Sequence, residues 1–218
     1  MQDHLRYTDE IQCAAARVVA AIRRLAKKHA FARTNTTTTS HPNPTGSFDS
    51  FHIRRGDFQR WYPEIFLSAS EIYQSNTRGI VPEGRTVYVA TDETNQTFFE
   101  PLREHYHLLF LNDFVAELGN LNPSYYGMVD QLVASRGHTF FGSYYSTFSG
   151  YINRLRGYHS QKQKAPGYET GIINSYYFAP DSLQSFRETM RIYKPISPGF
   201  WNQEFPVAWR DIDFDVES

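Results

Sequence analysis

The 218-residue sequence has little of what marks several common protein classes. It contains one cysteine, Cys13, so an internal disulfide is excluded. No apolar run approaches the ~20 residues of a membrane-spanning helix, and residues 1–4 lack the apolar centre of a signal peptide. The 22 basic and 23 acidic residues leave a formal net charge of -1, which predicts no general attraction to nucleic acid or anionic membranes.

The composition nevertheless supports a folded domain. Hydrophobic residues make up 40% of the chain and aromatic residues 16%, which is enough for a sizeable core in about one domain. Short apolar runs at residues 86–91 and 107–111 stop at polar residues. Because their hydrophobicity is uninterrupted rather than alternating, they are typical of strands that helices cover on both faces.

Strands and helices are predicted to alternate along the chain. Residues 51–53 and 139–142 are the other two predicted strands, and apolar residues recur at helical spacing in residues 98–106, 125–136 and 146–156. We expect Pro101 to delay or kink the first of these helices and Ser124 to cap the second. The alternation predicts an α/β fold with a Rossmann-like, doubly wound sheet, whose ligand crevice lies outside the carboxyl ends of the strands.

A short hydrophobic strand leads directly into two arginines and a glycine within residues 51–58. Arg54 and Arg55 are candidates for an anion site, because a guanidinium group presents a planar fork of donors that matches phosphate oxygens. Alternate strand residues share a face, so His52 and Arg54 should point one way, and only Arg54 should reach the crevice. Gly56 would permit a sharp turn. The alternative is a solvated turn with ordinary surface arginines.

A second anion-binding feature is predicted where Ser146, Thr147 and Phe148 begin a helix. Free backbone N–H groups and the positive end of the helix dipole favour an anion there, and the hydroxyl groups add donors. Asp92 and Arg54 both follow strands, so we expect these groups at the same edge of the sheet. Simple helix capping by Ser146 or Thr147 is the alternative.

Three motifs resemble, in order and spacing, the GDP-fucose protein O-fucosyltransferase family. They are residues 52–58, residues 88–93, and Asp130 followed by residues 146–149. They are also similar to the related α1,6-fucosyltransferases, which carry a comparable His-x-Arg-Arg stretch. The resemblance covers about residues 48–178, and it implies a GT-B enzyme with two Rossmann-like halves. This chain would correspond to the C-terminal half, which binds the donor.

The resemblance also implies a role for each matching residue. Arg54 would be the catalytic residue that contacts the diphosphate and steadies the leaving group, with Arg55 beside it as a further substrate-binding residue. His52 would line the nucleoside part of the site. Asp130 would read the guanine edge, because a carboxylate accepts two parallel guanine N–H donors that adenine cannot supply; the alternative is an exposed helix acid. The residues that would hold phosphate and base are Ser146, Thr147 and Phe148.

The implied reaction is an inverting transfer of fucose from GDP-fucose, the donor substrate, to a protein or glycan hydroxyl. It would need neither a metal nor another cofactor, because Arg54 would stabilise the charge that gathers on the departing diphosphate. The only Asp-x-Asp run, residues 211–215, is expected to be a solvated acidic tail. His105 and His107 are spaced i, i+2, which does not favour a zinc site.

Three segments are predicted along the chain: an N-terminal helix at residues 1–33, a polar, disordered linker at 34–47, and a Rossmann-like GDP-fucose-binding domain at 48–218. The first segment is too short to be the other half of a GT-B enzyme. We therefore expect a truncated form without the acceptor platform or the catalytic base. Relatives work in the endoplasmic reticulum or Golgi lumen, but no signal or anchor is visible, so the compartment stays open.

These observations predict a GDP-fucose-dependent fucosyltransferase. Its partners would be a nucleotide-sugar donor and a protein or glycan acceptor, and not nucleic acid. The alternative is a non-catalytic GDP-sugar-binding module or remnant that needs a partner half. An unrelated phosphate-binding enzyme such as a phosphatase would need a nucleophile or metal cluster that the sequence does not show.

Overall fold

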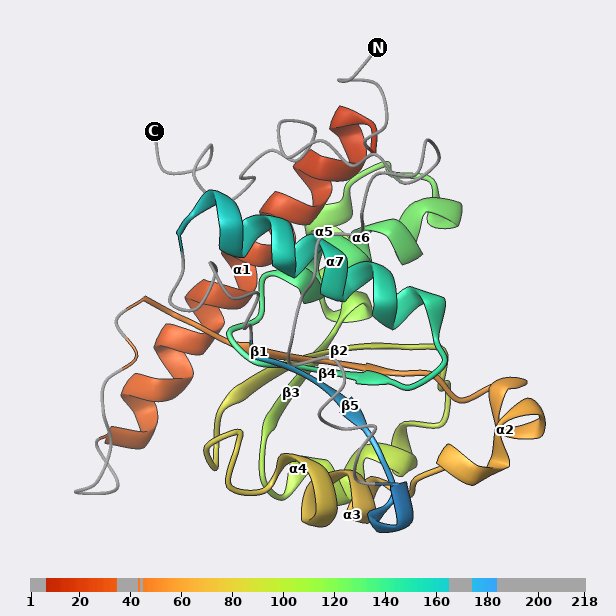
Figure 1. Ribbon diagram of the computed structural model, residues 1–218. Helices are drawn as coiled ribbons and strands as arrows, with labels where there is room; N and C mark the ends of the chain where they lie inside the picture. The colour runs from red at the N-terminus through yellow and green to blue at the C-terminus, as the bar shows by residue number, and fades with distance from the viewer. Residues whose placement is uncertain (1–6, 35–42, 44, 165–173, 184–218) are drawn as a thin grey trace.

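The computed structural model describes residues 7–34, 43, 45–164 and 174–183, and these form an α/β fold on one sheet of five parallel strands (Figure 1). The order in the sheet is β3-β2-β1-β4-β5. The predicted Rossmann-like fold class is therefore confirmed. The chain adds β2 and β3 on one side of β1 and then returns to add β4 and β5 on the other, so the order reverses between β1 and β4. The strands are β1 (Asp49–Ile53), β2 (Thr86–Thr91), β3 (His107–Phe110), β4 (Phe140–Ser143) and β5 (Ser175–Phe178).

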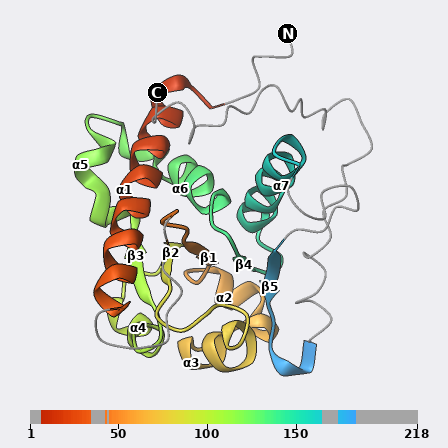
Figure 2. The ribbon, with the colours of Figure 1, turned by 90° about the vertical axis from the view of Figure 1, so that its left-hand side faces the viewer.

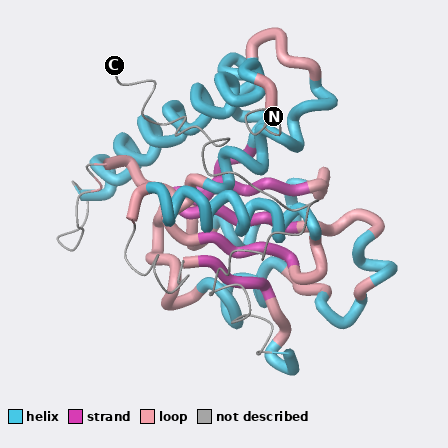
Figure 3. Tube along the Cα trace, turned by 45° about the horizontal axis from the view of Figure 1, so that its top comes forward, coloured by secondary structure: helices cyan, strands magenta, loops and turns pink. Residues whose placement is uncertain are grey.

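Helices cover both faces of the sheet (Figures 1 and 2). One face carries α1 (Asp9–Thr34), α6 (Tyr126–Ser135) and α7 (Thr147–Lys162), and the apolar side chains between them and the sheet form the first core. The other face carries α3 (Ala69–Glu71), the π-helical turn η3 (Ile72–Thr77) and α4 (Glu100–Arg103), which enclose the second core. Figure 3 shows the strands side by side, with helical segments on either side of them.

Strand residues divide between the two cores by alternation. Tyr88 on β2 faces the first core, and Val87 and Val89 face the second. On β1, Phe51 faces the second core, whereas His52 points to the opposite face and is only 4% exposed. This burial on both faces explains the uninterrupted apolar runs of the sequence.

Shorter helical segments connect these elements. The structure adds detail to the sequence expectations at two positions, the cap near Ser124 and Pro101. Asn122, rather than Ser124, is the capping residue here: it precedes η6, the segment that leads into α6, and its side chain accepts a hydrogen bond from the Ser124 N–H. Pro101 lies in the first turn of α4. The backbone N–H of any residue in this turn has no partner within the helix, so proline loses no hydrogen bond there. The connecting segments are α2 (Phe58–Trp61), η2 (Pro63–Ile65), η4 (Gln96–Phe99), η5 (Leu111–Phe114), α5 (Val115–Leu118), η6 (Pro123–Tyr125) and η8 (Asp181–Leu183).

The N-terminal helix α1 is part of the first core. Ala15, Val18 and Ile22 on its apolar side are fully buried in this core, whereas Leu25 is 38% exposed. Arg17 on α1 donates from Nε to the Glu117 carbonyl oxygen at 2.7 Å and so fastens the helix to α5. Most of the predicted linker, residues 35–42 and 44, lies outside the described residues. The proposed domain boundaries remain predictions.

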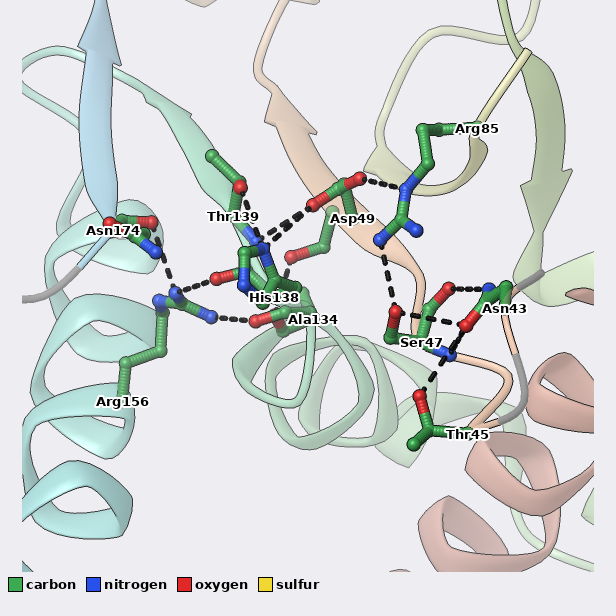
Figure 4. A network of polar contacts seen from close by, with 12 residues as sticks. Asn43, Thr45, Ser47, Asp49, Arg85, Ala134, His138, Thr139, Arg156 and Asn174 are labelled. Carbon is green, nitrogen blue, oxygen red and sulfur yellow. Dashed lines mark hydrogen bonds and ion pairs between the residues drawn. The ribbon is translucent and has the colours of Figure 1, made fainter. Parts of the chain in front are cut away.

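A buried polar network joins the starts of β1 and β4, at the opposite edge of the sheet from their carboxyl ends (Figure 4). Asp49 is 1% exposed, accepts a hydrogen bond from the Thr139 N–H at 2.9 Å and pairs with Arg85 Nε at 3.0 Å. Burial alone would raise the pKa of Asp49, but the nearby His138 side chain, 3.8 Å away, and the charge of Arg85 outweigh it and hold that pKa below its usual value.

The buried Arg156 of α7 belongs to the same edge (Figure 4). Its guanidinium donates to the carbonyl oxygens of His138 and Asn174, each at 3.0 Å, and so fastens α7 to the starts of β4 and β5. Burial lowers the pKa of Arg156 to about 10, which leaves the group charged at neutral pH.

Candidate functional site

A cleft of about 490 Å³ lies outside the carboxyl ends of β1 and β2 and beside the start of α7. This is the edge at which the strand order reverses, where doubly wound sheets bind ligands. Six of the seven predicted site residues line the cleft: His52, Arg54, Asp130, Ser146, Thr147 and Phe148. The other lining residues are Phe58, Thr91, Asp92, Gly127 and Tyr145.

Arg54 follows β1 directly, and its guanidinium lies between two carboxylates. Nη1 donates to Asp92 Oδ2 at 2.5 Å, and Nη2 donates to Asp57 Oδ1 at 2.6 Å. The Arg54 backbone N–H donates to Ser143 Oγ at 2.9 Å, which ties the end of β1 to the end of β4. The side chain is 36% exposed. The carboxylates therefore fix the direction of the guanidinium, while its remaining N–H groups can donate to a ligand.

Asp92 also organises the turn after β1. Its Oδ1 accepts a hydrogen bond from the Arg55 backbone N–H at 2.7 Å. A Cβ atom on Gly56 would lie 2.5 Å from Asp92 Oδ2, so this close approach requires glycine. The predicted turn at Gly56 is present, and a carboxylate at the end of β2 holds it.

Arg55 lies outside the cleft. Its Nε pairs with Glu93 Oε2 at 2.6 Å, and its guanidinium lies 3.7 Å from the ring centroid of Phe98 and 4.7 Å from that of Phe66. Only 14% of the side chain is exposed. Adjacent arginines thus diverge at the strand end, and Arg55 fastens the loop to the neighbouring layer.

His52 is a buried, neutral ring in the wall of the cleft. Its Nδ1 is 2.7 Å from Ser149 Oγ, and its ring stacks on Phe148 with centroids 4.5 Å apart. Burial, and then the nearby charge of Arg54, lower the pKa of His52 to about 3. Through these contacts His52 fixes the position of the Phe148 ring.

Asp130 contributes a carboxylate to the cleft from α6. Its Oδ1 accepts a hydrogen bond from the Tyr88 hydroxyl at 2.5 Å. Burial raises the pKa of Asp130 to about 7, although the hydrogen bond from Tyr88 acts in the opposite direction. Around neutral pH this carboxyl group can therefore gain or lose a proton.

The start of α7 forms another part of the wall. Ser146 precedes the helix, and its carbonyl oxygen accepts a hydrogen bond from the Gly150 N–H at 3.0 Å, so its predicted place at the helix start is present. Thr147 and Phe148 form the first turn. Tyr145 has a φ of 60°, a left-handed conformation that costs a non-glycine residue about 1–2 kcal/mol. Such strain is concentrated at functional sites.

The sequence placed Asp92 at the same edge of the sheet as Arg54, and both line the cleft as expected. It singled out none of the other four lining residues. Thr91 ends β2 just before Asp92, so the same rule applies to it. Gly127 lies one helical turn before Asp130 and therefore shares its face of α6. Phe58 and Tyr145 carry no comparable signal, because aromatic residues are common throughout this chain.

The two histidines, His105 and His107, have different neighbours. His105 Nδ1 lies 3.2 Å from Glu83 Oε2, whereas the ring of His107 stacks on His29 with centroids 4.3 Å apart. Within the described residues, no three His, Cys, Asp or Glu side chains are grouped so that they could hold a metal ion. The acidic run at residues 211–215 lies outside the described part of the chain.

The parallel sheet, the covering helices and a polar cleft at the switch point define a Rossmann-like α/β protein. A family model of the GDP-fucose protein O-fucosyltransferases matches residues 1–159, which is more than half of the chain. The chain therefore belongs to this family. Membership indicates fucosyltransferase activity in broad terms, with a nucleotide-sugar donor and an acceptor.

A search of curated proteins found no match. None of the helices in the described residues is long and apolar enough to span a membrane.

Proposed function

We propose that the chain binds GDP-fucose in the cleft beside β1 and α7 and supplies the donor-binding half of a GT-B fucosyltransferase. The single observation that carries this proposal is that one cleft contains both the Arg54 guanidinium and the Asp130 carboxylate. Its volume of about 490 Å³ lies within the ~300–1,000 Å³ that is usual for small-molecule sites. Family membership supports the choice of donor.

Asp130 is the group that distinguishes guanine from other bases in this proposal. An ionised carboxylate accepts the two neighbouring N–H groups of guanine, and adenine offers no such pair. Binding of adenine would leave the carboxylate unpaired, at a cost of about 1–3 kcal/mol. The stacked Phe148 and His52 rings offer an aromatic surface for the base.

Arg54 and the start of α7 hold the diphosphate. Asp92 and Asp57 keep the guanidinium in one orientation, so little side-chain entropy is lost when its remaining donors bind phosphate oxygens. As the bond from fucose C1 to the diphosphate lengthens, negative charge grows on the leaving group. A preorganised cation stabilises that charge more in the transition state than in the ground state, which accelerates the step.

The transfer itself is proposed to invert the anomeric carbon and to need no metal or other cofactor. The acceptor is a protein or glycan hydroxyl. The second candidate function is a GDP-sugar-binding module without activity of its own. The sequence favours it in one respect, since no residue of this chain could be assigned as the base that activates the acceptor hydroxyl.

Labelled GDP-fucose tests the proposal and separates the two functions. Equilibrium dialysis with the 218-residue chain should show saturable binding that unlabelled GDP displaces. Transfer to folded-domain and N-glycan acceptors should be slow or absent, because catalysis requires both reactants in near-attack geometry, which can account for about 7–11 kcal/mol of the barrier. Fast transfer without a partner would reject the module, and failure of GDP to displace the label would reject both functions.

A further inference from the structure

Tyr88 is a residue of the interior strand β2 that the proposed function does not use. The side chain is fully buried in the first core, yet its hydroxyl reaches the cleft carboxylate and donates to Asp130 Oδ1 at 2.5 Å. A buried hydroxyl is costly unless it is hydrogen-bonded. Phenylalanine would fill the same apolar space, so packing alone does not explain the phenol.

We infer that Tyr88 is a positioning residue for guanine recognition, because its hydroxyl holds one oxygen of Asp130 and so aims the carboxylate at the N–H edge of the base. This inference rests on the proposed function. Each carboxylate oxygen has two acceptor sites, and Tyr88 occupies one of those on Oδ1. The remaining sites on Oδ1 and Oδ2 are sufficient for two parallel N–H donors. Because β2 is paired on both sides, with β1 and β3, and the Tyr88 ring is buried, the hydroxyl also limits rotation of the carboxylate.

The same hydrogen bond sets how easily the carboxylate takes up a proton. The pKa of Asp130 is about 7, raised by burial and opposed by the Tyr88 hydroxyl. A protonated Asp130 cannot accept both guanine N–H groups, so guanine selectivity should weaken as the pH falls below about 7. Loss of the hydroxyl should raise this midpoint.

Other titratable groups around the pair come from several neighbouring elements. His52 on β1 remains neutral because its pKa is about 3. Asp113 of η5 acts on Tyr88 through its charge, and Tyr7, which precedes α1, is hydrogen-bonded to Gln131 beside Asp130. The groups that share the cleft are Arg54, Asp92 and Tyr145.

Calorimetry of GDP and ADP binding across the pH range tests the inference on wild type and Tyr88→Phe. The ratio of the two affinities is the readout, because the diphosphates of both nucleotides titrate alike and cancel. In wild type the preference for GDP should fall about tenfold per pH unit below the midpoint. In Tyr88→Phe the midpoint should rise by about one pH unit, which lowers the ionised fraction of Asp130 at pH 7, and with it the preference for GDP, about fivefold.

Tyr106→Phe is the matched control. Tyr106 is also a buried tyrosine with a hydrogen-bonded hydroxyl, to Thr77 Oγ1 at 3.0 Å, but it belongs to the second core. Tyr106→Phe should lower stability while leaving the GDP/ADP affinity ratio and its pH midpoint unchanged. If Tyr88 were merely structural, Tyr88→Phe would give the same result as this control.

Asp130→Asn changes the other member of the hydrogen-bonded pair. It can be measured even if Tyr88→Phe does not fold. Its amide oxygen can still accept from Tyr88, but its charge is absent, so the pH dependence of the ratio should disappear. An unchanged ratio and midpoint in folded Tyr88→Phe, or a surviving pH dependence in Asp130→Asn, would overturn the inference alone. A wild-type chain that binds GDP and ADP equally at every pH would overturn the proposed guanine site as well.

Discussion

Arg54 and Arg55 are neighbours in the chain whose guanidinium groups lie in different surroundings. Arg54 lines the cleft with partly exposed donors, whereas Arg55 is enclosed by Glu93 and two phenylalanine rings. The strand geometry predicted this divergence, because consecutive residues leave a strand on opposite sides. Asp92 was expected at this edge of the sheet, but its ion pair with Arg54 could not be predicted, since it depends on how the loop after β1 meets the end of β2.

Substitution of each arginine by alanine should separate binding from stability. Arg54→Ala should weaken diphosphate binding by about 1.5–3 kcal/mol, the value of a charge-assisted hydrogen bond, with a small change in unfolding free energy. Arg55→Ala should leave binding less affected and lower stability, because Glu93 loses its partner and the two rings lose a stacked cation. Calorimetry with GDP and urea unfolding measure both quantities. A larger loss of affinity in Arg55→Ala would contradict the assigned geometry.

Asp130 combines a proposed binding role with a cost to folding. Its pKa rises from 3.8 in the unfolded chain to about 7 in the native protein, so the unfolded chain releases the proton first as pH rises. Stability from this group is therefore present below about pH 4 and is lost progressively up to about pH 7.

Asp130→Asn should remove the loss of stability that ionisation of Asp130 causes between pH 4 and 7. Relative to wild type, the variant should gain unfolding free energy as the pH rises from 4 to 7, and the difference should stay constant at higher pH. Urea unfolding of both proteins at several pH values gives this difference directly and cancels the other titrating groups. A difference that does not depend on pH would show that Asp130 has an ordinary pKa.

At the scale of elements, α6 and α7 frame the cleft, and each has a glycine in its first two turns, Gly127 and Gly150. Gly127 on α6 lines the cleft, and a Cβ atom there would lie 3.7 Å from Phe148 Cε2. Gly150 on α7 has no heavy atom within 4 Å of the equivalent position. Glycine weakens a helix, so its presence at Gly127 is consistent with a need for space at the cleft.

Alanine substitutions at the two glycines form a matched pair. Both Gly127→Ala and Gly150→Ala should stabilise the protein by about 0.5–1 kcal/mol, because alanine loses less backbone entropy in a helix. Only Gly127→Ala should weaken nucleotide binding, since its methyl group narrows the space beside Phe148. Thermal unfolding and calorimetry distinguish the two effects. Equal affinities in both variants would show that the ligand does not approach α6 at this point.

The elements differ in how far the sequence predicted them. The strands at β1 to β4 and the helices α1, α6 and α7 were predicted because burial on both sheet faces, or helical spacing, leaves a clear pattern. The short β5 was not, since four residues of mixed burial, Ser175–Phe178, carry no readable period. Tyr88 was correctly predicted to lie in a strand. Its hydrogen bond to Asp130 was not predicted, because nothing in the surrounding apolar run indicates a polar partner for its hydroxyl.

At the scale of the molecule, the two edges of the sheet have different characters. The edge at the strand starts is tied by Asp49 and Arg156, whose polar groups are satisfied by buried partners (Figure 4). The opposite edge carries the cleft, with a strained Tyr145 and a carboxyl group, Asp130, of raised pKa. This contrast indicates that the first edge holds the fold together while the second is shaped for a ligand.

Recognition of guanosine diphosphate by this cleft is the proposal on which the assigned roles depend. Calorimetry of the wild-type chain with GDP, GDP-fucose, ADP and UDP, at a pH where Asp130 is ionised, tests it. GDP and GDP-fucose should bind at least tenfold more tightly than ADP and UDP, a difference of about 1.4 kcal/mol or more. Asp130→Ala should reduce that preference without unfolding the protein. Equal affinity for all four ligands in the wild-type chain, or no binding of GDP, would contradict the account.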